Sequence, residues 1–318
     1  MDICYIKEAS NIDEVLSSWQ LKLPKLIKKI IFKLKQAFRI VKVRTEKNKK
    51  VYILPMLEEQ NIKDKKFELL AEKLNKDFNA LYGVNIVLSS YLSRQEVFTK
   101  CFKHLKMIDG TKIFNILLLE LVGYICDKQG ENMNEQNISI LVNNDTGNII
   151  QSILLLSENV KGITIVTNNI NKFTDVGNQI CDKLGMVVKV TNNKKKSLYK
   201  ANIIVNMDFK EEDINRYTVN KDAVIINVYN KNVTYKKNFN GIIINSFETI
   251  FDKQDEQFFK TFNLYDSFDK VQLLETILCE NTNFKNMRIK LNNSKIVIDK
   301  VIGNNGYITD LEFIRKNT

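Results

Sequence analysis

From Ile138 onward the chain alternates short apolar runs with longer stretches of helical periodicity. The helical stretches cover 147–158 and 171–184. The apolar runs cover 138–142, 163–166, 186–190, 203–205, 224–226 and 242–244. Apolar runs that alternate with helices predict buried parallel strands joined by right-handed crossovers. Residues 138–248 are therefore expected to form a doubly wound, Rossmann-like domain.

The first 110 residues predict a smaller α/β domain. Ser10 or Asn11 can cap a helix that runs through Trp19, and Pro24 precedes a second helix from Lys25 to Ala37. The elements expected after it are strands at 38–44 and 51–54 that form a hairpin, a helix at 67–81, a strand at 84–88 and a helix at 93–105. This order of helices and strands is an α/β arrangement.

Four parts follow from this pattern, and the predicted fold class is α/β. An N-terminal α/β domain covers 1–110, and a connecting segment at 111–137 contains a long apolar helix at 111–127. The doubly wound domain covers 138–248, and a C-terminal tail of helix and strand covers 249–318 and is expected to pack back on the body. Within the tail we expect a helix at 269–278 and strands at 289–291 and 295–302.

Scarce residue types exclude several kinds of site. The chain has one His, His104, so a metal site with several His ligands within one chain is excluded. No two of the 11 Gly form a G-x-G-x-x-G or a G-x-x-x-x-G-K-[ST] motif, so the standard phosphate-binding loops are absent. The five Cys are widely spaced, without a C-x-x-C, as is typical of reduced cytoplasmic thiols. No apolar run spans a bilayer and the first residues do not resemble a secretory signal, so a cytoplasmic location is expected.

The positive charge is concentrated near the N-terminus. The formal net charge is +11, from 48 Lys and Arg against 37 Asp and Glu. Residues 1–50 hold 13 Lys and Arg against 5 Asp and Glu, which gives +8 of that total. The candidate basic surface consists of Lys25, Lys28, Lys29, Lys33, Lys35, Lys194, Lys195 and Lys196.

The predicted helix at 25–37 has an apolar side formed by Leu26, Ile27, Ile30, Ile31 and Leu34. The pattern favours packing of this side on the domain, with the lysines in water, although Phe32 falls among the lysines. Three other partners stay open for residues 22–50: nucleic acid, an anionic membrane surface and an acidic protein. For Lys194, Lys195 and Lys196, which follow the third strand of the predicted sheet, the favoured interpretation is a solvated turn.

Four segments form a recognisable pattern: ITIVTNN at 163–169, Lys172, the turn Leu184-Gly185, and ANIIVN at 201–206. They resemble the strand with Asn-Arg-Thr, the Leu-Gly turn and the Ala-Asp-Ile-Val-Ile-Asn strand of the nucleotide domain shared by shikimate dehydrogenases and glutamyl-tRNA reductases. The resemblance covers 138–248, and the order of the predicted parts is similar as well. It implies NAD(P) as cofactor and oxidoreductase chemistry.

The positions that bind and react in that family differ in this chain. A Rossmann loop needs Gly because Cβ atoms block the approach of a diphosphate to backbone N–H groups. Asn143, Asp145 and Asn148 stand at the three Gly positions, and Asn169 stands where the family has the Arg that binds a 2′-phosphate. The Asn-Pro-x-Lys substrate loop and the Cys-Asn-Arg nucleophile are absent. Asp145 or Thr146 suits the N-cap of the following helix instead.

The favoured function is a non-catalytic binding or regulatory protein whose degenerate Rossmann-like domain has lost dinucleotide binding, without a cofactor or a metal. The candidate cofactor-binding positions, by resemblance, are Asn143, Asp145, Thr146, Gly147, Asn168 and Asn169. Two alternatives stay open. One is an NAD(P)-dependent oxidoreductase with an altered cofactor loop, and the other is a nucleic-acid or membrane-surface adaptor that acts through residues 22–50.

Overall fold

The computed structural model describes residues 2–57, 64–79, 84–228, 239–278, 283–294 and 296–314. The chain forms two compact units. The first unit combines residues 1–110 with 252–280, and the second combines 111–251 with 281–318. The predicted tail thus divides between the two units.

The first unit contains a five-stranded sheet with the order β2-β3-β1-β4-β5. Its strands are β1 (Ile3–Glu8), β2 (Lys42–Glu46), β3 (Lys49–Leu54), β4 (Asn85–Leu88) and β5 (Lys106–Met107). β1 lies in the centre and pairs in parallel with β3 and β4, whereas β2 pairs antiparallel with β3. Its helices are α1 (Ile12–Val15), η1 (Gln20–Lys22), α2 (Lys25–Ala37), α3 (Asp64–Asn79), α4 (Ser90–Ser93), α5 (Glu96–Phe102), α12 (Lys253–Thr261) and α13 (Lys270–Leu278).

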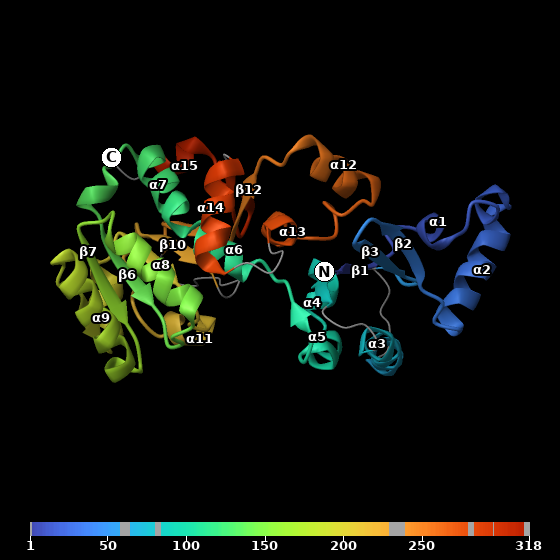
Figure 1. The fold of residues 1–318 in the computed structure, drawn as a ribbon, viewed down its shortest axis with the longest axis horizontal. Helices are drawn as coiled ribbons and strands as arrows, with labels where there is room; N and C mark the ends of the chain where they lie inside the picture. Colours follow the sequence, from blue (N-terminus) through green and yellow to red (C-terminus); the bar gives the residue numbers. More distant parts are fainter. Residues whose placement is uncertain are drawn as a thin grey trace. The chain divides into compact units, whose positions relative to one another are not determined.

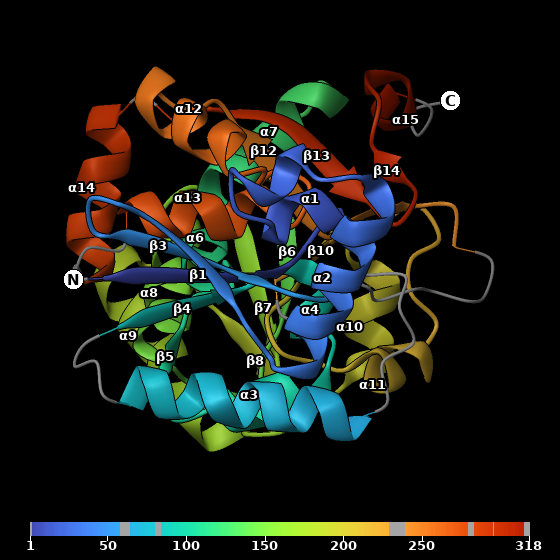
Figure 2. The ribbon, with the colours of Figure 1, turned by 90° about the vertical axis from the view of Figure 1, so that its right-hand side faces the viewer.

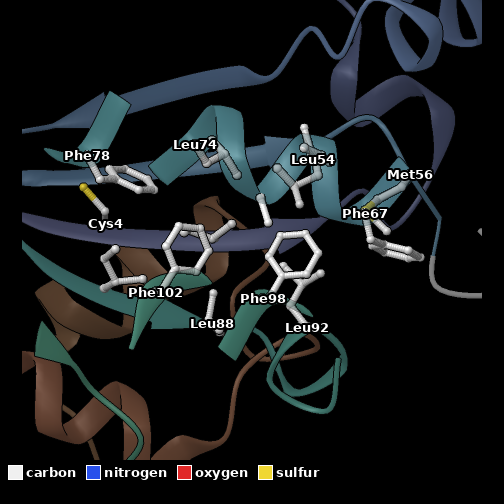
Figure 3. Close-up of a cluster of buried hydrophobic side chains, with 14 of the residues drawn as sticks. Cys4, Leu54, Met56, Phe67, Leu74, Phe78, Leu88, Leu92, Phe98 and Phe102 are labelled. Carbon is white, nitrogen blue, oxygen red and sulfur yellow. The ribbon is translucent and has the colours of Figure 1, made fainter. Parts of the chain in front are cut away.

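Alternate residues of β1 pack on opposite faces of this sheet. Tyr5 points toward α12 and α13, where its hydroxyl donates to Thr276 Oγ1 at 2.7 Å and its ring contacts Phe258. On the other face, Cys4 and Ile6 join a core cluster with α3 and α5 (Figure 3). Figure 1 shows the sheet between these two helical layers. The unit therefore has a core on both sides of β1.

The structure confirms some of the predicted elements of this unit and corrects others. The helix at 25–37 and the hairpin of β2 and β3 are present. The central strand β1 is missing from the prediction, and the helix expected through Trp19 ends at Val15. The helix expected at 93–105 is shorter, α5 at 96–102, and a separate short helix, α4, precedes it at 90–93. Leu81, the expected end of α3, lies outside the described residues.

The second unit contains a six-stranded, wholly parallel sheet with the order β11-β10-β9-β6-β7-β8. Its strands are β6 (Asn137–Leu141), β7 (Gly162–Val166), β8 (Lys189–Thr191), β9 (Ile203–Asn206), β10 (Val224–Asn227) and β11 (Ile242–Ile244). If β6 to β11 are numbered 1 to 6, the sheet read from β8 to β11 has the order 3-2-1-4-5-6, which is the Rossmann order. The predicted doubly wound α/β fold is confirmed.

Helices cover both faces of this second sheet. Figure 2 shows α8 (Gly147–Ser157) and α9 (Ile170–Leu184) on one side of its strands, with α10 (Lys194–Lys200) and α11 (Glu211–Asn215) on the other. The long helix expected at 111–127 is divided at Leu117 into α6 (Thr111–Ile116) and α7 (Leu118–Gln129), and η2 (Met133–Glu135) follows.

The second unit ends in a small antiparallel sheet with the order β12-β13-β14. Its strands are β12 (Ser246–Thr249), β13 (Ile298–Gly303) and β14 (Gly306–Tyr307), and its helices are α14 (Phe284–Ser294) and α15 (Asp310–Ile314). The strand predicted at 289–291 is wrong, because these residues lie within α14. Met287 and Leu291 are buried from this helix, which is the four-residue spacing of one helical face.

Candidate functional site

The candidate site lies at the switch point of the second sheet, where β6 and β9 are neighbours and the chain proceeds outward in both directions. In open α/β sheets, ligands bind beyond the carboxyl ends of the strands at this point. The loop after β6 contains Asn143, Asn144, Asp145 and Thr146, and α8 begins at Gly147. Asp208 lies in the loop after β9.

Asp208 closes the loop after β6 from within the chain. Its carboxylate accepts the backbone N–H of Asn143 at 2.8 Å and 3.0 Å and that of Asn144 at 2.6 Å. The side-chain amide of Asn144 donates to the same carboxylate at 2.7 Å. Burial raises the pKa of the Asp208 carboxyl, and the two N–H groups oppose that rise. A carboxylate of the chain itself thus occupies backbone N–H donors in the loop between β6 and the N-terminus of α8.

Asn143 connects the loops after β6 and β7. Its side-chain oxygen accepts the backbone N–H of Asn168 at 2.9 Å, and its carbonyl oxygen accepts the side-chain amide of Asn169 at 2.8 Å. By resemblance both asparagines are candidate cofactor-binding positions, and Asn169 stands where the family has the Arg that binds a 2′-phosphate. In the structure both are used to join the two loops.

The remaining loop positions are exposed. Asp145 forms an ion pair with Lys172 at 3.2 Å, which lowers the pKa of the Asp145 carboxyl. Thr146 occupies the N-cap position of α8, although its side chain makes no capping hydrogen bond. A Cβ added at Gly147 would meet no atom within 4 Å, so this Gly is not required by close packing.

Lys194 is the first residue of α10, so the turn expected for Lys194, Lys195 and Lys196 is wrong. Asn193 caps this helix by accepting the N–H of Lys196 at 3.1 Å. The Lys194 ammonium donates to Asn168 Oδ1 at 2.8 Å and lies 5.2 Å from the centroid of the Phe209 ring. Lys195 and Lys196 are exposed. Lys194 therefore belongs to the candidate site, whereas the other two lysines face solvent.

A chain of asparagine side chains continues from the switch point toward β11. Asn206 donates to Asn227 Oδ1 at 3.2 Å, Asn227 donates to Asn245 Oδ1 at 2.9 Å, and Asn245 donates to Asn304 Oδ1 at 2.5 Å. Asn206 also binds the backbone N–H and carbonyl of Phe209, which shapes the turn that carries Asp208. Because Asn206 is fully buried in this network, its amide is used for structure.

The described residues show no cluster of three or more His, Cys, Asp or Glu that fits a metal ion. Burial raises the pKa of the Cys4 and Cys126 thiols to about 11, and it also raises the pKa of Cys101. A raised pKa suppresses the reactive thiolate. His104 Nε2 lies 3.0 Å from Asn79 Oδ1 at an exposed position. Cys279 lies outside the described residues.

Sequence reasoning missed Asp208, the residue that organises the site. The available signal is its position: it follows the strand β9 by two residues, and β9 is the neighbour of β6 in a Rossmann order. An acidic side chain at that position reaches the loop after β6. The prediction identified both strands but did not combine their neighbouring ends.

The basic N-terminal segment corrects a second prediction. In α2, Phe32 is buried, whereas Leu26, Ile27, Ile30 and Leu34 are exposed. The predicted packing of the apolar side on the domain is therefore wrong. The lysines divide between two environments. Lys28 and Lys35 are half-buried, and Lys25, Lys29 and Lys33 are exposed. No helix of the described residues is long and apolar enough to cross a membrane.

No protein-family model and no curated protein matches this sequence. Similar solved structures include an L-tryptophan dehydrogenase from Nostoc punctiforme, which is 11% identical. The match covers 92% of this chain and 89% of the dehydrogenase, with a TM-score of 0.31. A shikimate 5-dehydrogenase from Listeria monocytogenes in complex with shikimate and NAD is 11% identical. The match covers 87% of this chain and 96% of the dehydrogenase, with a TM-score of 0.32. An anabolic ornithine carbamoyltransferase from Campylobacter jejuni is 9% identical and covers 87% of each chain, with a TM-score of 0.30. Similarity at this level does not carry a function from those proteins to this chain.

Proposed function

We propose that this chain is a non-catalytic binding or regulatory protein whose Rossmann-like unit has lost dinucleotide binding. The observation that carries the proposal is the position of the Asp208 carboxylate, which accepts the backbone N–H groups of Asn143 and Asn144. A diphosphate would have to compete with this carboxylate for the same donors. The competitor belongs to the chain, so it is always present at the loop.

Electrostatic repulsion supports the same conclusion. Two like charges about 4 Å apart repel by about 4 kcal/mol at an effective dielectric near 20. That energy corresponds to about three decades in affinity. A diphosphate at the loop would meet the carboxylate of Asp208 and, at the next turn, that of Asp145. Lys172 offsets only the second of these charges.

The candidate residues also lack a catalytic arrangement. A nucleophile is activated by an adjacent base, a lowered pKa or a metal, whereas burial raises the pKa of each of Cys4, Cys101 and Cys126. Lys194 interacts with Asn168 and an aromatic ring, so its ammonium orients the loops. The amide of Asn206 is committed to the turn at Phe209. We therefore assign Lys194 and Asn206 a structural role, in which they fix the loops at the switch point.

Thermal unfolding with dinucleotides tests this function. With NAD+ or NADP+ at 1 mM, we expect the unfolding midpoint of the full chain to change by less than about 1 °C, because a ligand stabilises only a state that it binds. A stabilisation of several degrees by either dinucleotide would instead support the oxidoreductase alternative. A dehydrogenase known to bind both dinucleotides confirms that the ligands are active.

The variant Asp208→Ala tests the role of the carboxylate directly. It frees the N–H groups of Asn143 and Asn144, so we expect it to bind inorganic pyrophosphate at least about tenfold more tightly than the unmodified chain, as measured by calorimetry. Asp222→Ala removes an exposed carboxylate elsewhere in the second unit and is the matched control. Equal pyrophosphate affinity in Asp208→Ala and the unmodified chain would show that Asp208 does not close the loop.

A further inference from the structure

The helix α2 is attached to the first unit by the side opposite to its apolar face. Phe32 is 3% exposed, whereas Leu26 is 71% exposed, and Ile30 and Leu34 are about half exposed. At 100° per residue, Leu26, Ile27, Ile30 and Leu34 fall within one arc roughly 100° wide, and Phe32 falls on the other side of the helix. Such an arc is the width that a surface helix normally buries against its own core, but here it faces outward.

Polar contacts hold α2 in this orientation. The ammonium of Lys28 lies 3.3 Å from Asp13 Oδ2, and that of Lys35 donates to the carbonyl oxygen of Val15 at 2.8 Å. Both contacts are to α1 or to its end, on the same side of the helix as Phe32. Figures 1 and 2 show α2 next to α1, on the outer side of the hairpin of β2 and β3.

Exposed apolar side chains extend beyond α2 to the segments before and after it. Among the described residues, 20 large hydrophobic side chains are exposed, and nine of them lie within residues 19–43. These nine, the outward apolar surface, are Trp19, Leu21, Leu26, Ile27, Ile30, Leu34, Phe38, Ile40 and Val43. The surface thus includes η1, α2 and the start of β2, which is more than one helical stripe.

The charge of the same segment has one sign. Residues 19–44 contain nine basic residues and no Asp or Glu: Lys22, Lys25, Lys28, Lys29, Lys33, Lys35, Arg39, Lys42 and Arg44. Lys25, Lys29 and Lys33 are exposed. At 100° per residue Lys29 and Lys33 follow one flank of the apolar arc, whereas Lys25 falls close to Phe32. Lys25 and Lys29 also line an open depression of about 510 Å³ between α2 and residues 10–13.

We propose that the outward apolar surface docks the protein on an anionic membrane, with α2 lying in the plane of the headgroups. Helices that lie in the membrane interface combine a strongly basic polar face with apolar and aromatic residues on the other face. Lys29 and Lys33 reach the lipid phosphates, and Leu26, Ile30 and Leu34 enter the acyl boundary. At about 1.5 Å per residue the 13 residues of α2 are about 20 Å long.

Other occupants fit these observations less well. Nucleic acid would neutralise the lysines but leave the apolar residues in water. A second copy would bring the same nine positive charges against each other. An acidic protein groove accepts a helical stripe such as Leu26, Ile30 and Leu34 but leaves Trp19, Ile40 and Val43 uncovered. A bilayer combines anionic phosphates for the lysines with an acyl boundary for the apolar side chains. The proposal is independent of the proposed function, because it concerns the first unit alone.

Trp19 supplies a direct measurement, because it is the only Trp of the chain and is 63% exposed. With vesicles of 70% phosphatidylcholine and 30% phosphatidylserine, we expect the full chain to cosediment and its Trp fluorescence to shift to the blue by about 5 nm or more as the ring leaves water. With pure phosphatidylcholine, and with the anionic vesicles in 0.5 M NaCl, we expect binding to fall at least about tenfold.

Two variants separate the apolar and the basic contributions. Leu26→Asp with Ile30→Asp should abolish the fluorescence shift, and Lys29→Glu with Lys33→Glu should weaken binding to the anionic vesicles at least about tenfold. The matched controls, Val187→Asp and Lys195→Glu with Lys200→Glu, change exposed residues of the second unit and should bind like the unmodified chain. Circular dichroism shows whether each variant is folded.

Three outcomes would overturn the proposal. The first is equal binding of the unmodified chain to neutral and anionic vesicles, or no binding to either. The second is a dimer of the full chain, seen by analytical ultracentrifugation without lipid, that Ile30→Asp dissociates, since the surface would then be covered by a second copy. The third is loss of vesicle binding in Val187→Asp to the same extent as in the α2 variants.

Discussion

At the scale of single residues, a buried ion pair fixes the carboxyl end of β1. Lys7 is fully buried, and its ammonium lies 2.9 Å from Glu14 Oε1, donates to the carbonyl oxygen of Asn263 at 3.1 Å and lies 3.5 Å from Ser10 Oγ. The other oxygen of Glu14 accepts the backbone N–H of Ser10 at 2.7 Å. The pair therefore connects β1, α1 and the residues after α12.

The variant Lys7→Met tests this pair. It leaves the Glu14 carboxylate, whose side chain is 7% exposed, without its cation. Breaking a buried pair in this way costs about 3–5 kcal/mol, so we expect a corresponding loss in the free energy of unfolding, measured in urea. Lys260→Met breaks the exposed pair with Glu256 and should leave the unfolding midpoint almost unchanged. A similarly small effect for Lys7→Met would show that the buried pair does not stabilise the fold.

Buried charged residues also explain why the sequence analysis did not predict β1. The strand ends in Lys7 and Glu8, both of which are buried, so the charges hide the alternation that normally identifies a strand. Asp208 was missed for a related reason. Its role depends on a hydrogen bond to residues 64 and 65 positions earlier in the chain. Local pattern contains no information on a partner at that distance.

At the scale of elements, α2 shows how periodicity predicts a helix but not its orientation. The spacing of apolar residues gave the bounds of the helix correctly, from Lys25 to Ala37. The same spacing favoured burial of the apolar side, yet Phe32, on the lysine side, is the residue in the core. Contacts with Asp13 and Val15 set the rotation of the helix, and both residues belong to another element.

The variant Phe32→Ala tests this attachment. Replacing a buried Phe by Ala costs about 3–5 kcal/mol in a typical core. Because Phe32 is the buried residue of α2, we expect the loss to appear as local unfolding. Hydrogen exchange of residues 25–37 should accelerate at least about tenfold, with little change in β3 and β4. The control Leu26→Ala removes an exposed side chain and should leave exchange unchanged. Uniform acceleration over the first unit would contradict local attachment through Phe32.

At the scale of the whole molecule, each compact unit is built from two separate stretches of chain. Residues 281–318 contribute α14, β13, β14 and α15 to the second unit. β13 is the central strand of the small sheet, and Val301 and Phe313 are fully buried. The first unit, in contrast, contains none of these elements. The C-terminal residues therefore form part of the core of the second unit.

Truncation after residue 280 tests this division. The shortened chain keeps every described element of the first unit but loses the partner of β12 and the buried side chains of α14, β13 and α15. We expect hydrogen exchange in β6 and β9 to accelerate strongly, since a core that loses several large side chains is destabilised. Exchange in β1 and β3 should stay close to that of the full chain. Equal acceleration in both units would contradict two separately stabilised units.

The sequence by itself determined the α/β class, the parallel strands of the second unit and the limits of α2, because hydrophobic periodicity follows the local geometry of strands and helices. Only the tertiary structure decided that Asp208 closes the loop after β6, that Lys7 is paired and that the apolar face of α2 points outward. Each of these features depends on which elements become neighbours. That information arises from packing between distant segments, and local periodicity does not encode it.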